Sequence, residues 1–254
     1  DVSNDIEDIT TAERMFEKSI VLNPQNHHAY INLANLLSMT GQVKKAFHIL
    51  IDAIDNCNQL DDETWNMAAL NLAKILSDYN QPDLAKKLYT HVLRISKAAN
   101  NPDRPTSLEY NHYASFLTKY GDYKSAEGYY KKSLAKDKHH FDSLINYAWT
   151  LQAMGQTSSS ERYYKMALQV EQNNKNADKN KLALVLDRLG SLYFSQNLVE
   201  DAKHAFEQAI ELNSKNGNFK AHLATILVNQ NEFKQAELQL ITAIKNDANC
   251  FYIE

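Results

Sequence analysis

The chain contains residues able to catalyse reactions or bind metals, but their spacing matches no catalytic or metal-binding motif. The sequence has no H-E-x-x-H, C-x-x-C, P-loop or G-x-G-x-x-G pattern, the short motifs that bring metal ligands or phosphate-binding amides together. Histidine pairs occur at His27 and His28 and at His139 and His140, and adjacent side chains on a helix do not face one point. We therefore expect a protein that is not an enzyme, with no metal and no cofactor.

The segment that positions the other residues is a unit of 34 residues, Ser107 to His140. Thr106 and Glu109 stand at capping-box spacing, which predicts the start of a helix. An apolar stripe follows at helical spacing, Gly121 interrupts it at a predicted turn, and a second stripe begins at Tyr123. Because one helix pair cannot bury stripes this wide, similar units are expected on either side.

The same residue types recur when every unit is counted in the same way, with Ser107 as position 1. Positions 8 and 20 are small, position 24 is large, and position 15, the predicted turn, is Gly or Asn. Small residues at 8 and 20 predict close approach of two helices, and Gly and Asn adopt a left-handed conformation at low cost. The residues are Ala34, Ala73, Ala114, Ala148, Gly190 and Ala224 at position 8; Ala46, Ala85, Ala126, Ser160, Ala202 and Ala236 at position 20; Gly41, Asn80, Gly121, Gly155, Asn197 and Asn231 at position 15; and Leu50, Tyr89, Tyr130, Tyr164, Phe206 and Leu240 at position 24.

This pattern resembles the tetratricopeptide repeat, whose period is 34 residues. The resemblance covers essentially the whole chain and is clearest in two runs of residues: Tyr30, Leu33, Ala34, Leu37, Gly41, Ala46, Leu50 and Ala53, and then Leu189, Gly190, Tyr193, Ala202, Phe206 and Ala209. It implies an all-α fold, a right-handed α-solenoid (superhelix) of helix-turn-helix repeats. It does not specify a partner, because fold does not fix function.

The predicted array is one continuous solenoid over residues 1–254. Its units are a partial repeat at 1–26, full repeats at 27–60, 66–99, 107–140, 141–174, 183–216 and 217–250, and the start of a further repeat at 251–254. Insertions at 61–65, 100–106 and 175–182 lie between repeats, and represent either tolerated length variation or a contact edge for a partner. Neither end has a polar cap, so we expect part of a longer array, and self-association through the uncapped ends stays open.

Composition and charge bear on the class of partner and on location. A net charge of -4 and a pI near 6.2 give no electrostatic reason to expect nucleic acid or an anionic membrane. No apolar run reaches the roughly 18 residues of a membrane span. Cys57 and Cys250 lie too many units apart to pair, and none of the 26 Asn residues is in an N-x-[ST] acceptor. These features favour a cytoplasmic or nuclear location.

The family resemblance implies that the first helix of each repeat lines a concave groove, with positions 6 and 9 facing it. Position 6 is Asn32, Asn71, His112, Asn146, Arg188 and His222, and position 9 includes Asn35, Lys74, Ser115, Trp149 and Ser191. Asn offers both a donor and an acceptor, which matches the backbone of an extended peptide. The arrangement is similar to the asparagine ladder in the repeat domain of O-GlcNAc transferase, although His112, Arg188 and His222 depart from it. The alternative is that Asn at position 6 is an ordinary solvated residue in an Asn-rich chain.

Two aromatic features leave alternatives open. Trp149 is either an exposed anchor for a partner or a packed residue covered by neighbouring helices. Most tyrosines fall at core positions, whereas Tyr129 and Tyr163 fall outside them and are interpreted as an outer surface patch.

The resulting hypothesis is a non-catalytic scaffold for protein–protein interaction that binds an extended peptide of a partner in its groove. The alternative is a substrate-recruiting repeat domain of a larger enzyme, for example a glycosyltransferase, whose catalytic part lies elsewhere. RNA binding is disfavoured because Asp142 and Asp187 offset Lys74 and Arg188. A carboxylate clamp of the kind that binds chaperone C-termini is excluded, because the required cations are missing at positions such as Ile31 and Leu108.

Overall fold

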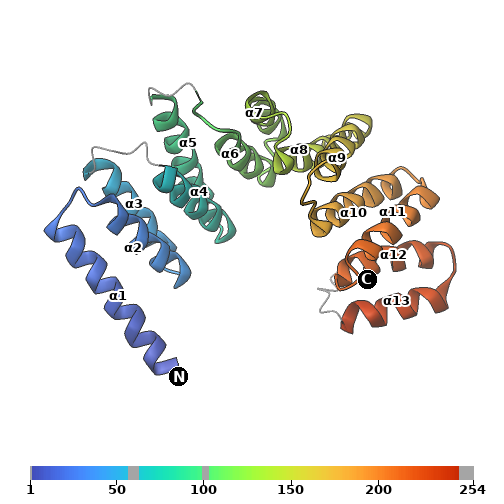
Figure 1. Ribbon diagram of the computed structural model, residues 1–254, viewed down its shortest axis with the longest axis horizontal. Helices are drawn as coiled ribbons and strands as arrows, with labels where there is room; N and C mark the ends of the chain where they lie inside the picture. Colours follow the sequence, from blue (N-terminus) through green and yellow to red (C-terminus); the bar gives the residue numbers. More distant parts are fainter. Residues whose placement is uncertain (1, 57–62, 99–102, 246–254) are drawn as a thin grey trace. The chain divides into compact units, whose positions relative to one another are not determined.

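The structure, a computed structural model, describes residues 2–56, 63–98 and 103–245 of the 254-residue chain (Figure 1). Within these residues the fold is entirely helical, with thirteen helices and no strand, as the sequence predicted. Cys57, Cys250, the segment 251–254 and parts of the insertions at 61–65 and 100–106 lie outside the described residues. The chain forms two compact units, Asp1–Lys136 and Asp137–Glu254, which are described separately below as unit 1 and unit 2.

Both units are built from paired helices (Figure 1). Unit 1 contains α1 (Val2–Leu22), α2 (His27–Met39), α3 (Val43–Asn56), α4 (Glu63–Asp78), α5 (Pro82–Ala98), α6 (Ser107–Lys119) and α7 (Tyr123–Lys136). Unit 2 contains α8 (Phe141–Ala153), α9 (Thr157–Gln172), α10 (Lys179–Ser195), α11 (Val199–Leu212), α12 (Gly217–Asn229) and α13 (Phe233–Lys245). From α2 onward, each even-numbered helix packs against the odd-numbered helix that follows it, and we call these the first and second helices of a pair.

The small residues at positions 8 and 20 lie in the seam between paired helices, as predicted. Ala73, Ala85, Ala114 and Ala126 all have no exposed surface. Large residues at position 24, such as Tyr130, are also fully buried and fill the space beside this seam. The two helices can therefore approach closely because neither presents a bulky side chain at the crossing.

The predicted turn residues adopt left-handed conformations, which confirms the role of position 15. Gly41, Gly121 and Gly155 have φ of 77°, 80° and 74°, and Asn80, Asn197 and Asn231 have φ of 54°, 61° and 61°. The backbone N–H of the next residue reaches back to the helix, as in Gln42 N–H to Leu37 C=O at 2.7 Å. This is the hydrogen bond of a Schellman motif, and it ends each first helix in the same way.

Gly190 occupies position 8 of α10, where the other first helices carry alanine. A Cβ added to Gly190 would lie 2.8–3.0 Å from three ring atoms of Phe206, a buried residue of α11. By contrast, a Cβ added to Gly128 in α7 would meet nothing within 4 Å. Position 8 is therefore glycine in this repeat because the Phe206 ring already occupies the space of a methyl group.

These two glycines give a matched stability test. We expect Gly190→Ala to destabilise the protein by about 1–3 kcal/mol, because the added methyl overfills the contact with Phe206. Gly128→Ala should instead stabilise it by about 0.5–1 kcal/mol, because glycine loses more backbone entropy than alanine in a helix. Urea denaturation followed by far-ultraviolet circular dichroism measures both changes. Equal effects of the two substitutions would contradict the packing argument.

A buried carboxylate joins three helices of unit 1. The predicted capping box is present: the Thr106 hydroxyl accepts from the Glu109 N–H at 3.3 Å, and Glu109 Oε2 accepts from the Thr106 N–H at 2.7 Å. Glu109 Oε1 also accepts from Asn66 Nδ2 at 2.9 Å, Ser96 Oγ at 2.7 Å and Arg104 Nη1 at 3.1 Å. Glu109 is 2% exposed, so this network links α4, α5 and α6 inside the fold.

Two of the inter-repeat insertions lengthen first helices. α4 begins at Glu63 and α10 at Lys179, so part of each insertion is helical. Trp65, which the repeat pattern assigns to the insertion at 61–65, has no exposed surface. Its ring lies 6.3 Å from that of His91 on α5. Trp65 therefore belongs to the core, although the repeat pattern assigns it to an insertion.

Candidate functional site

The candidate residues of unit 1 lie on three first helices that pack side by side. α4 contacts both α2 and α6, so residues at equivalent positions on these helices succeed one another along a common face. We call this the first-helix face of unit 1. It presents Asn32 and Asn35 from α2, Asn71 and Lys74 from α4, and His112 and Ser115 from α6. All are exposed except His112, which is half-buried.

Asn32 and Asn71 are available to bind a partner. Both side chains are exposed, and neither forms a hydrogen bond with another residue in the described part of the chain. Each amide offers two N–H donors and one carbonyl acceptor. Two such amides on neighbouring helices can pair with the N–H and C=O groups of an extended peptide without breaking an internal contact.

Charge on this face is concentrated at Lys74. Lys119 forms an ion pair with Asp78 at 2.7 Å, and both side chains are about half exposed. Lys74 is exposed and forms no ion pair with any residue the structure describes. Two flexible apolar side chains flank the face, Met39 and Met67, which are 86% and 36% exposed. The face thus combines free amides and one cation with adaptable apolar surface.

The candidate residues of unit 2 are Asn146 and Trp149 on α8, Arg188 and Ser191 on α10, and His222 on α12. α10 contacts both α8 and α12, so these residues also share one face. Trp149 is 42% exposed, which favours the exposed alternative over the packed one. Leu184 and Val228 add partly exposed apolar surface to the same three helices. This face is more apolar than that of unit 1.

Asn146 and His222 differ from the free amides of unit 1 because both already have partners inside the protein. His222 Nδ1 lies 2.6 Å from Asp187 Oδ1, and its ring is 5.4 Å from Phe206. Asp187 is 4% exposed. The expectation that Asp187 offsets Arg188 as an open groove charge is therefore wrong, because this carboxylate is buried and faces His222.

Tyr129 of unit 1 and Tyr163 of unit 2 are less exposed than a surface position suggests. Both are half-buried, and each packs against a tyrosine of the preceding first helix. The ring centroids of Tyr129 and Tyr113 are 4.8 Å apart, and those of Tyr163 and Tyr147 are 4.6 Å apart. Burial raises the pKa of Tyr113 above its usual value, as expected for a packed phenol rather than a titrating site.

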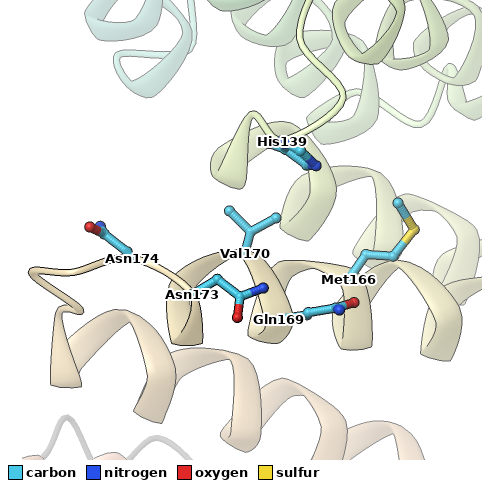
Figure 2. Close-up of a pocket in the computed structure, with 6 residues that line it drawn as sticks. All are labelled: His139, Met166, Gln169, Val170, Asn173 and Asn174. Atoms are coloured by element: carbon cyan, nitrogen blue, oxygen red, sulfur yellow. The ribbon is translucent and has the colours of Figure 1, made fainter.

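Hollows also occur away from these two faces. One in unit 2 has a volume of about 290 Å³ and is lined by His139, Met166, Gln169, Val170, Asn173 and Asn174 (Figure 2). Figure 2 shows Val170 pointing from α9 toward His139. Its lining carries no carboxylate, lysine or arginine. No group of three or more potential metal ligands occurs within the described ranges, and none of the helices described there could cross a membrane.

The sequence matches models of the tetratricopeptide repeat over residues 15–48, 139–215 and 193–253. Together with the paired helices and left-handed turns, these matches decide the family. The chain belongs to the tetratricopeptide repeat family. Members of this family generally act as protein-interaction modules and are typically non-catalytic. The sequence matches no curated protein at a significant level.

Several solved structures share this fold. One from Parabacteroides merdae aligns with a TM-score of 0.68 and 17% identity, covering 97% of this chain and 90% of its own. The Cut9–Hcn1 hetero-tetramer of the APC/C gives 0.67 and 14%, covering 96% of this chain and 44% of that chain. pilF of Pseudomonas aeruginosa gives 0.62 and 15%, covering 88% and 92%. At these identities the similarity shows the fold alone.

Proposed function

We propose that this tetratricopeptide repeat protein is a non-catalytic scaffold that binds an extended peptide segment of a partner protein. The observation that carries the proposal is the pair of free, exposed amides of Asn32 and Asn71 on neighbouring first helices. An extended peptide exposes one N–H and one C=O per residue. Each asparagine can donate to one of these groups and accept from another, which recognises the backbone whatever the sequence of the peptide.

The unit 2 face supplies a different kind of contact. Trp149 is the largest exposed side chain at the candidate positions, and exposed tryptophans are enriched among residues that dominate binding energy. Arg188, on the neighbouring helix α10, is exposed and forms no ion pair with the described residues. We infer that this face binds an apolar side chain of the partner, with a carboxylate nearby.

The peptide-binding proposal is tested by removing the two free amides together. Dodecapeptides selected from a random display library on the wild-type chain serve as probes, with affinity measured by fluorescence anisotropy. We expect Asn32→Ala combined with Asn71→Ala to weaken binding about tenfold or more, because two amide pairings are lost. The fold should persist, since both side chains are exposed and neither forms a hydrogen bond with another described residue.

The matched control is Gln172→Ala combined with Gln235→Ala, which removes two exposed amides from second helices. N-methylation of single backbone amides of the peptide provides an independent test of backbone recognition. If the asparagines bind backbone, a methylated peptide loses affinity for the wild-type chain but loses little more for the double variant. Equal binding to the wild type, the asparagine variant and the glutamine control would refute the proposal.

A further inference from the structure

Positive charge is concentrated on the second helices α5 and α7, away from the first-helix faces. Eight of the 27 Lys and Arg residues lie on these two helices, but only two of the 31 Asp and Glu residues do. Their combined net charge is therefore +6, which leaves 19 cations, 29 anions and a net charge of -10 for the rest of the chain. Net positive charge is thus concentrated on these two helices, whereas the rest of the chain is net negative.

A hollow lies within this basic surface. It has a volume of about 450 Å³ and is lined by Thr90, Leu93, Arg94, Lys97 and Ala98 of α5 and by Tyr129 of α7. We call it the basic pocket. Thr90, Arg94 and Lys97 follow one another at spacings of four and three residues, so they project from one face of α5. Leu93 and Ala98 give the pocket an apolar wall beside its cations.

The cations at the pocket are not neutralised inside the protein. Arg94, Lys97 and the adjacent Lys132 are exposed, and none forms an ion pair with a residue that the structure describes. Lys132 Nζ lies 4.5 Å above the centre of the Tyr129 ring, which holds its ammonium group at the pocket. The one carboxylate on α7, Glu127, is paired with Lys131 at 2.7 Å. Arg94 and Lys97 therefore line this hollow and Lys132 lies beside it, and none of the three forms an ion pair with a described residue.

This charge is not a general property of the repeats. The hollow of Figure 2, which is lined mainly by α9, has a lining without lysine, arginine or carboxylate. A second hollow in unit 2, of about 480 Å³, is lined by four leucines, two glutamines and Glu211. A third hollow, in unit 1, is lined in part by Lys44 and Lys45 of α3. Hollows with and without cations therefore both occur along the repeats, and the basic pocket is distinguished by Arg94 and Lys97 in its lining together with Lys132 beside Tyr129.

We propose that the basic pocket binds an anionic side chain within a short acidic or phosphorylated segment of a second protein. Arg94 Nη2 lies 3.3 Å from His91 Nδ1, and the other N–H groups of the guanidinium can donate hydrogen bonds to a carboxylate or phosphate, while Lys97 and Lys132 add positive charge. The apolar wall formed by Leu93 and Ala98 accommodates the methylene groups that carry the anion. The ligand chemistry is therefore an anion on a short aliphatic stem.

A peptide fits this surface better than a nucleic acid or a membrane. A long polyanion would extend beyond α5 and α7 onto surfaces whose summed charge is -10, where repulsion opposes it. Single-stranded nucleic acids also need open aromatic faces for stacking. One face of Tyr129 is covered by Lys132, and its ring packs against Tyr113 at 4.8 Å. The surface is suited to a few anionic residues rather than a polymer.

The test uses a fluorescein-labelled ten-residue peptide with a central serine among glutamates, together with its phosphoserine form. Affinity for the full chain is measured by anisotropy at low and physiological salt. We expect salt-sensitive binding that the combined substitutions Arg94→Gln, Lys97→Gln and Lys132→Gln weaken about tenfold or more. The matched control is Lys18→Gln, Lys44→Gln and Lys45→Gln, which removes the same charge from exposed residues of α1 and α3.

The outcomes distinguish a phosphorylated segment from an acidic one, and a peptide partner from a nucleic acid or a membrane. Tighter binding of the phosphoserine form identifies a phosphorylated segment, and equal binding of both forms identifies an acidic one. Equal loss in the two triple variants would overturn the proposal, because the effect would then reflect net charge alone. Absence of binding to either peptide would also overturn it. So would tighter binding of a poly-uridine strand or phosphatidylserine vesicles, which would assign the surface to another class of partner.

Discussion

Glu109→Ala is expected to lower the stability of the protein by about 3–5 kcal/mol, because it leaves a buried cation and several buried donors without their acceptor. Glu109 is 2% exposed and accepts hydrogen bonds from side chains of α4, α5 and the segment before α6. Among the donors that lose their acceptor is Arg104, whose side chain is 11% exposed. Urea denaturation by circular dichroism measures the loss.

Two variants show whether the carboxylate itself is responsible. Glu109→Gln keeps one acceptor oxygen but loses the charge, so its effect should be smaller, about 1–3 kcal/mol. Glu207→Ala removes an exposed carboxylate from α11 and should change stability little. Hydrogen exchange should also locate the weakening of Glu109→Ala at the start of α6 and the facing ends of α4 and α5. If Glu109→Ala and Glu207→Ala unfolded at the same urea concentration, the buried carboxylate would not contribute to stability as expected.

The second large effect is expected at Trp65. Trp65→Ala should destabilise the protein by about 3–5 kcal/mol, because it leaves a cavity where a fully buried indole packs against α5. Thermal or urea denaturation measures the change. Trp65 stands in the residues that the repeat pattern treats as an insertion, so a surface role would predict almost no effect.

A conservative change at the same residue sharpens this test. Trp65 Nε1 is buried and has no hydrogen-bond partner among the described residues. Trp65→Phe removes this unpaired donor while keeping most of the apolar volume, so the cavity cost is partly offset. We expect a loss below about 1.5 kcal/mol for Trp65→Phe. Similar losses for the two variants would show that packing at Trp65 contributes less than its burial indicates.

The sequence by itself determined the fold family and the location of most turns. Residues such as Gly41 and Asn80 were predictable because a left-handed conformation restricts the residue type at one position. Ala85 and Ala126 were predictable because a close helix crossing excludes larger side chains. Both constraints act locally and recur in every repeat, so the sequence period is enough to predict them.

The tertiary structure decided which polar and aromatic residues have partners. Asn32 and Asn146 share position 6, yet Asn146 has a partner inside the protein and Asn32 has none among the described residues. Asp187 is charged and falls at a groove position, yet it is buried against His222. Residue type and spacing place a side chain on a helix face, but its partners come from residues far away in the sequence.

The same reason explains the buried network and the basic pocket. The capping box of Thr106 and Glu109 was visible in the sequence because its two members are three residues apart. The hydrogen bond from Asn66 to Glu109 joins residues that are 43 positions apart in the sequence. Neither residue departs from the repeat pattern, so the sequence around them does not predict this bond. Likewise, Arg94 and Lys132 belong to different repeats. Their charges lie near one hollow because α5 and α7 both pack against α6, which the folded chain determines and the repeat pattern does not.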